Sequence, residues 1–140
     1  RDDRLSEHNL SLSLGYAQEE TLAVAQLLLG GVLDRHPTLD VCVSHGGGTA
    51  AFLAEKMDQL AQVDPAASES VKRNGFGHEL QNLWFDTHVK GELAAAALRH
   101  YAHEDKLVLG TNLGGFDTPD DLSADAARLS QNARRLLRLP

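Results

Sequence analysis

Leu39-Asp-Val-Cys-Val-Ser-His-Gly-Gly-Gly48 is the stretch that decides the fold of this 140-residue chain. Its first part, residues 39–44, is short, contains β-branched side chains and is flanked by Pro and Gly, which is typical of a buried strand. The three glycines after His45 indicate a tight turn. Residues 49–61 then repeat apolar side chains at helical spacing with charged residues between them, which indicates an amphipathic helix. The unit is therefore strand, glycine turn and helix.

The same kind of pattern continues on both sides of this unit. Upstream, apolar residues at helical spacing predict a helix over residues 19–36, which Pro37 ends. Downstream, the patterns predict strands over 83–87 and 106–110, helices over 92–101 and from a Thr118 cap to Arg138, and a loop over 63–81, where neither period is present.

One helix followed by three strand–helix pairs is typical of an α/β protein with a parallel sheet. Two architectures fit this order, an open doubly wound sheet and a (β/α)₈ TIM barrel. Because a complete barrel takes eight strands and about 250 residues, this chain holds at most a portion of one. No domain boundary is visible in residues 1–140.

Composition excludes several classes of function. Thirteen Lys and Arg against 20 Asp and Glu give a formal net charge of −7, which argues against nucleic-acid and membrane-surface partners. The only cysteine, Cys42, excludes an internal disulfide and a Cys-based zinc site, and we expect it to be buried and inert. No segment is apolar enough to span a membrane, and we expect a cytoplasmic protein. The chain opens without Met, so we expect a preceding portion.

Functional side chains in parallel α/β proteins gather where the strands end. His45 is the strongest candidate, because an imidazole beside glycines can approach a substrate closely and act as acid, base or metal ligand. The alternative is that the glycines serve only the turn into the next helix. A phosphate-binding loop is weakly supported, because no Lys-Ser/Thr follows the glycines.

The other two strand ends also carry polar side chains. Asp86 and His88 are two residues apart and are expected to point to the same side, as a metal site or proton relay requires, although a surface turn explains them equally well. Asn112 and Asp117 share the loop after the third strand and offer oxygen ligands, although both types are common in loops. The other histidines show no ligand spacing, and we expect them to face solvent; they are His8, His36, His78, His100 and His103.

Taken together, these motifs resemble the amidohydrolase-related family that includes aminocarboxymuconate semialdehyde decarboxylase and the resorcylate-type decarboxylases. The resemblance covers about residues 17–138. It is carried by Glu20-Thr-Leu-Ala-Val-Ala-Gln-Leu-Leu-Leu-Gly-Gly-Val-Leu-Asp-Arg-His-Pro37, the stretch 39–48, Leu83-Trp-Phe-Asp-Thr87, Lys106-Leu-Val-Leu-Gly-Thr111 and Asn132-Ala-Arg-Arg-Leu-Leu137.

The resemblance implies that the chain is the C-terminal part of a single (β/α)₈ barrel domain and contains its sixth, seventh and eighth strands. In such relatives a divalent ion, often zinc, is held by an N-terminal His-x-His pair, a histidine of the fifth strand and an aspartate of the eighth. His45 matches the sixth-strand histidine that acts in acid/base chemistry. The residues expected to contact a small carboxylate substrate are Gly46, Gly47, Asp86, His88 and Phe116. Relatives commonly form dimers, so a homodimer is expected.

One departure from the family pattern concerns the metal. The aspartate expected after the eighth strand is replaced by Asn112, whose amide oxygen is a neutral and poorer ligand than a carboxylate. The metal site is then weakened, rebuilt with Asp117 or lost. Two hypotheses follow. The first is a metal-dependent decarboxylase or hydrolase within a longer protein, and the second is a non-catalytic fragment or assembly module that keeps the barrel scaffold.

Overall fold

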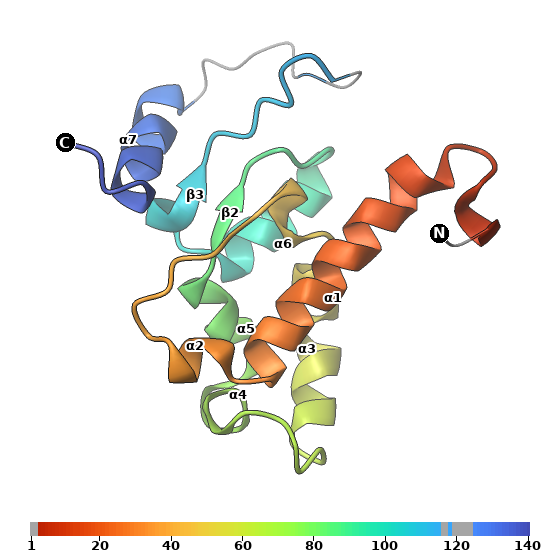
Figure 1. Ribbon diagram of the computed structural model, residues 1–140, viewed down its shortest axis with the longest axis vertical. Coiled ribbons are helices and arrows are strands. Elements are labelled where there is room, and N and C mark those ends of the chain that lie inside the picture. The colour runs from red at the N-terminus through yellow and green to blue at the C-terminus, as the bar shows by residue number, and fades with distance from the viewer. Residues whose placement is uncertain (1–2, 116–117, 119–124) are drawn as a thin grey trace.

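Three short parallel strands form the centre of the chain, in the order β1-β2-β3 (Figure 1). They are β1 Cys42–Val43, β2 Trp84–Asp86 and β3 Leu107–Val108. The computed structural model describes residues 3–115, 118 and 125–140. The predicted parallel α/β arrangement is confirmed. Each strand is shorter than its sequence pattern suggests, although pairing begins before β1, where the Trp84 N–H donates to the Val41 carbonyl (2.9 Å).

Helices alternate with the strands. They are α1 Tyr16–Leu29, α2 Val32–Arg35, α3 Ala50–Ala61, α4 Glu69–Asn74, α5 Phe76–Glu79, α6 Glu92–Tyr101 and α7 Ala126–Leu136. Single turns occur at η1 Asp3–Leu5, η2 Ser11–Gly15, η3 His45–Gly47, η4 Leu80–Asn82 and η5 Glu104–Lys106. The helix predicted over 19–36 is interrupted because Gly31 takes a left-handed conformation, with φ of 63°. The predicted Thr118 cap extends into residues 119–121, which lie outside the described residues.

The core lies on one face of the sheet. Val43, Phe85 and Leu107 lie at the same level on neighbouring strands and all belong to the buried apolar cluster. Side chains of α1, α3 and α6 belong to the same cluster, among them Val24, Leu28, Ala50, Ala54 and Leu98. Burial of these side chains is the main force that holds the helices on the sheet.

Residues 63–68 form the predicted loop, but residues 69–82 form short helices, so the prediction of a loop over 63–81 is wrong for its larger part. The Ser68 hydroxyl accepts the Val71 N–H and begins α4, and Gly75, with φ of 93°, separates α4 from α5. Val71 and Phe76 are fully buried. A helix of four to six residues is too short to show a period in the sequence, which is why the pattern was absent.

Cys42 is exposed, which corrects the expectation that it is buried. Successive residues of a strand point to opposite faces, and Val43 points into the core, so Cys42 points away from it. On that other face Cys42 lies opposite Trp84 of β2. In the part of the chain that the structure describes, no helix is long and apolar enough to cross a membrane.

The C-terminal helix α7 packs against β3 through a buried amide. Asn132 is 3% exposed, and its Nδ2 donates to the carbonyls of Glu104 (2.9 Å) and Leu107 (2.7 Å). Its Oδ1 accepts a hydrogen bond from Arg135 (2.7 Å). The motif that begins at Asn132 therefore fastens the last helix to the last strand.

Candidate active site

His45 lies two residues after the end of β1, where the chain turns toward α3. Its backbone is left-handed, with φ of 47°, and the three glycines that follow are left-handed too. Such backbone is uncommon for a residue with a side chain. The imidazole is 42% exposed, so solvent or a ligand can reach it.

The glycines are required by close packing as well as by the turn. A Cβ on Gly48 would lie 2.1 Å from the Ala17 carbonyl oxygen of α1, and one on Gly47 would lie 2.7 Å from the Phe85 ring. Real side chains cannot approach so closely, so only glycine lets the turn sit against both α1 and β2. The glycines therefore form the tight turn, as predicted, and the turn leaves the His45 imidazole accessible at its start.

Asp86, at the end of β2, lies beneath the glycine turn. Its Oδ1 accepts the backbone N–H groups of Gly46 and His88, each at 3.2 Å. Burial raises the pKa of the Asp86 carboxyl above its ordinary value, and these two N–H groups and the nearby imidazoles of His45 and His88 lower it in part. The aspartate thus links the ends of two neighbouring strands.

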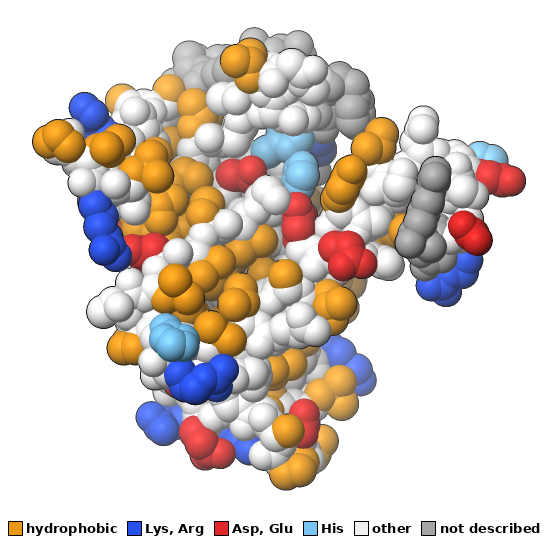
Figure 2. Space-filling view, viewed as in Figure 1, with side chains coloured by type: hydrophobic (Ala, Val, Ile, Leu, Met, Phe, Trp, Pro, Cys, Tyr) orange, Lys and Arg blue, Asp and Glu red, His pale blue; other side chains and the backbone are white. Residues whose placement is uncertain are grey.

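His88 is buried, and its ring lies beside that of His45, with 5.1 Å between the centroids and 52° between the planes. The end of β3 closes the other side, because a Cβ on Gly110 would lie 2.8 Å from the His88 Cβ. The structure therefore brings His45, Gly46, Asp86 and His88 together. Figure 2 shows histidine and acidic side chains gathered in a hollow of the surface beside α1.

Glu20 of α1 also belongs to this candidate site, although the sequence analysis did not single it out. Its Oε1 lies 2.7 Å from His45 Nδ1 and accepts the Ser44 hydroxyl at 2.6 Å. The one signal in the sequence was its position four residues before Val24, which places a carboxylate on the buried side of the helix. That signal could not identify the partner 25 residues away.

Of the two residues predicted to bind metal, Asn112 and Asp117, the structure describes Asn112 alone. Asn112 is exposed after β3, with a left-handed φ of 42°, and its carbonyl accepts the Gly115 N–H and the Thr118 hydroxyl. Asp117 and Phe116 lie outside the described residues. Among residues 3–115, 118 and 125–140, no three His, Cys, Asp or Glu side chains converge as metal ligands do. The described donors alone therefore do not fit a divalent ion.

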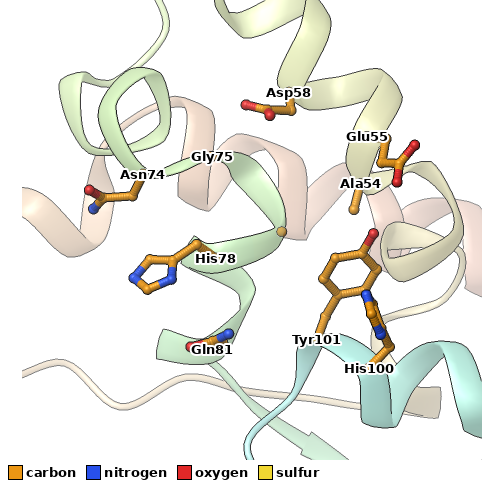
Figure 3. Close-up of a pocket in the computed structure, with 10 residues that line it drawn as sticks. Ala54, Glu55, Asp58, Asn74, Gly75, His78, Gln81, His100 and Tyr101 are labelled. Atoms are coloured by element: carbon orange, nitrogen blue, oxygen red, sulfur yellow. The ribbon is translucent and has the colours of Figure 1, made fainter.

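A pocket also lies away from these strand ends. A polar pocket of about 390 Å³ lies between α3, α5 and α6, and Figure 3 shows Tyr101 and His100 of α6 facing α3 there. None of the predicted site residues lines it.

The histidines expected to face solvent are all exposed, as predicted; they are His8, His36, His78, His100 and His103.

Comparison with known proteins identifies relatives over nearly the whole chain. The amidohydrolase family model matches residues 3–139. A 2-amino-3-carboxymuconate-6-semialdehyde decarboxylase from Dictyostelium discoideum is 30% identical over 110 residues, which are 79% of this chain and 31% of that protein. The chain thus spans about a third of the length of this curated relative.

Several solved structures share the fold. An IDCase from Metarhizium anisopliae in apo form matches with a TM-score of 0.67 and 24% identity, over 94% of this chain and 37% of its own. A protein described as amidohydrolase II matches with a TM-score of 0.71 and 18% identity, over 99% of this chain and 48% of its own. The 4-oxalomesaconate hydratase from Rhodopseudomonas palustris matches with a TM-score of 0.63 and 20% identity, over 91% of this chain and 43% of its own. Each similarity is one of fold, and this chain spans less than half of each structure.

Proposed function

Because the chain belongs to the amidohydrolase family, we propose that the protein containing it is an enzyme that decarboxylates or hydrolyses a small carboxylated compound, aromatic or unsaturated. The observation that carries the proposal is the position of His45. It follows β1, is open to solvent, and has Asp86 and His88 at the end of the next strand beside it. Catalytic groups of parallel α/β enzymes occupy this edge of the sheet.

His45 is the group that moves a proton. In decarboxylation the bond to the carboxylate carbon breaks, carbon dioxide leaves, and the electron pair left on the remaining carbon takes a proton from the imidazolium. In hydrolysis the neutral imidazole takes a proton from the attacking water. Asp86 holds the glycine turn through the Gly46 N–H, so it keeps the imidazole at the strand end in either reaction.

Members of this family are generally metal-dependent, and a divalent ion supplies polarisation of a substrate oxygen or of water when bound. We propose zinc, with ligands from segments outside the described residues. Asn112 is the nearest counterpart of the expected aspartate within this chain, and no step of the proposed chemistry depends on it.

We also propose that the three strands are the sixth to eighth of a (β/α)₈ barrel. Two observations support this. The chain matches less than half of each similar structure, and Cys42 leaves one face of β1 exposed. In a closed barrel that face points into the packed interior.

The test of the proposed activity replaces His45 with Asn, which tolerates the left-handed backbone of this position. The protein containing this chain, purified with its metal, is offered 2-amino-3-carboxymuconate 6-semialdehyde and a panel of carboxylated aromatic and unsaturated acids. We expect carbon dioxide release or hydrolysis with one of them, and a loss of about 10²-fold or more in the variant. His36→Asn, at an exposed histidine, is the matched control. Turnover within about threefold of the parent in His45→Asn contradicts the role of His45.

A second candidate is a non-catalytic module that keeps the scaffold, and the observation that favours it is the amide of Asn112 at the ligand position. Asn112→Asp tests it, because Asp also tolerates the left-handed backbone found there. If the site is degraded, elemental analysis finds a stoichiometric divalent ion only in the variant. A stoichiometric ion in the parent protein contradicts the non-catalytic candidate.

A further inference from the structure

The carboxylate of Glu20 reaches His45 from α1, outside the strand ends that carry the rest of the site. Its Oε1 lies 2.7 Å from His45 Nδ1 and 2.6 Å from the Ser44 hydroxyl, which donates to it. Only 15% of the Glu20 side chain is exposed. Its second oxygen, Oε2, is buried and has no hydrogen-bond partner among the described residues.

The chemistry of these atoms decides the direction of the hydrogen bond. An ionised carboxylate only accepts, so the imidazole nitrogen that faces it must carry a hydrogen. Neutral His45 is then the Nδ1–H tautomer, and Nε2 is left as the nitrogen that takes or gives a proton. A tautomer held in this way presents the same nitrogen to the substrate in every turnover.

We propose that Glu20 is a positioning residue, which holds His45 in the Nδ1–H tautomer and assigns proton transfer to Nε2. This inference rests on the proposed function only for its effect on turnover. The tautomer itself is a property of the protein without substrate.

The attachment of α1 to the glycine turn does not require Glu20. Thr21 and Thr49 already join the two segments, because their hydroxyls lie 3.0 Å apart and the Thr49 N–H donates to the Thr21 hydroxyl at 2.8 Å. Gly48 also packs directly against the Ala17 carbonyl. Burying a carboxylate with one oxygen unpaired costs free energy, so a purely structural role would favour an apolar residue at this position.

The contact between Glu20 and His45 also helps to hold the left-handed backbone of His45. Residues with a side chain adopt this conformation at a cost, and it persists where surrounding contacts hold it. The bond from Nδ1 to Glu20 and the bond from the Gly47 N–H to the Ser44 carbonyl (2.8 Å) both hold the turn. The Ser44 hydroxyl donates a hydrogen bond to the same oxygen of Glu20, and this bond orients the Glu20 carboxylate.

The decisive experiment determines the tautomer by NMR. The protein containing this chain is labelled with ¹⁵N-histidine, and long-range ¹H–¹⁵N spectra are recorded at about pH 8.5, where an imidazole is neutral. Loss of signals in His45→Asn assigns the resonances. We expect Nδ1–H in the parent protein and a shift toward Nε2–H in Glu20→Met, which keeps the length and helix propensity of the side chain but offers no acceptor. If Glu20→Met does not fold, Glu20→Ala takes its place.

Matched variants separate positioning from packing. Thr21→Val removes the hydroxyl that fastens α1 to the turn and is expected to lower stability while leaving Nδ1–H at His45. Ser44→Ala removes the other donor to Glu20 and is expected to keep Nδ1–H as well. Nε2–H in the parent protein, or Nδ1–H retained after loss of Glu20, overturns the inference.

The effect on turnover distinguishes this inference from the proposed function. Loss of a group that orients a functional histidine typically costs about 10–100-fold, so we expect a loss of that size in Glu20→Met with the substrate found above. If His45→Asn leaves turnover unchanged, the proposed role of His45 fails while the tautomer result stands. If His45→Asn abolishes turnover but Glu20→Met changes neither turnover nor tautomer, the Glu20 inference alone fails.

Discussion

At the scale of the residue, the site depends on a carboxyl group that is partly removed from water. Asp86 is not needed as an anion for its two observed hydrogen bonds, because both backbone N–H groups donate to the same oxygen, Oδ1. An amide oxygen can accept both. An ionised Asp86 therefore costs stability through burial, and the carboxyl group nevertheless lies beside two histidines, as expected of a group that serves function.

This reasoning predicts how stability depends on pH. The folded pKa of Asp86 is raised above the ordinary value, so its contribution to stability is fully present below the ordinary carboxyl pKa and is lost as pH rises through the folded pKa. In Asp86→Asn that loss is absent. We expect parent and variant to unfold at similar urea concentrations near pH 3.5, and the variant to become relatively more stable by pH 7.

Urea unfolding curves at several pH values check this prediction, with the slope of each curve compared so that only stability changes are scored. A difference between parent and variant that stays constant from pH 3.5 to 7 would contradict it. Turnover of Asp86→Asn, measured in parallel, shows whether the charge that costs stability serves the reaction.

At the scale of the element, short helices and a buried amide hold the sheet together. The segment 63–81 contributes Val71, Phe76 and Leu80 to the core, so it is part of the packed framework. Within it the buried carboxylate of Glu79 accepts hydrogen bonds from the amides of Asn74 and Asn82, one on each oxygen. These contacts explain how helices too short to be stable alone persist here.

The buried amide of Asn132 in α7 is predicted to contribute to the stability of the chain. Asn132→Ala leaves the Glu104 and Leu107 carbonyls without their amide donor, and a buried polar group without its partner costs about 1–3 kcal/mol. We expect the free energy of unfolding to fall by about that amount, measured by urea unfolding. Gln131→Ala, at the exposed neighbouring position, is the control and should change stability by less than about 0.5 kcal/mol. Equal effects of the two substitutions would show that Asn132 does not fasten α7.

At the scale of the whole molecule, the open question is what covers the face of the sheet that carries Cys42. The α/β order and the parallel pairing were predicted from the sequence and are confirmed, because strand and helix periods are local properties of the chain. The exposure of Cys42 was not predicted, because which face of a strand is covered depends on the segments that pack against it. The proposed barrel supplies those segments from outside residues 1–140.

Thiol labelling tests this proposal. Although Cys42 is exposed, partial desolvation of its thiol, together with the nearby charge of Asp86, raises the pKa of that thiol. Labelling is therefore compared at a fixed pH of about 8.5, where some thiolate is present. We expect Cys42 to react readily in the isolated 140-residue chain and about tenfold or more slowly in the longer protein, since tenfold protection needs only about 1.4 kcal/mol of opening free energy. Mass spectrometry of the Cys42 peptide gives the rates.

The control for labelling is the same pair of proteins in urea, where the two rates should converge. Circular dichroism and a thermal melt establish that the isolated chain is folded under the labelling conditions. Equal rates in the two folded proteins would contradict the barrel arrangement, because Cys42 would then be as open in the longer protein as in this chain.

The sequence by itself determined the order of the three strands and of the longer helices between them, the glycine turn, and the position of His45, Asp86 and His88 at the strand ends. These follow from periodicity and from residue types that act over a few positions. Only the tertiary structure decided that Glu20 meets His45, that residues 69–82 enter the core, and that burial raises the pKa of Asp86. The physical reason is that a contact across 25 residues, and the loss of water around a carboxyl, depend on how elements pack in space.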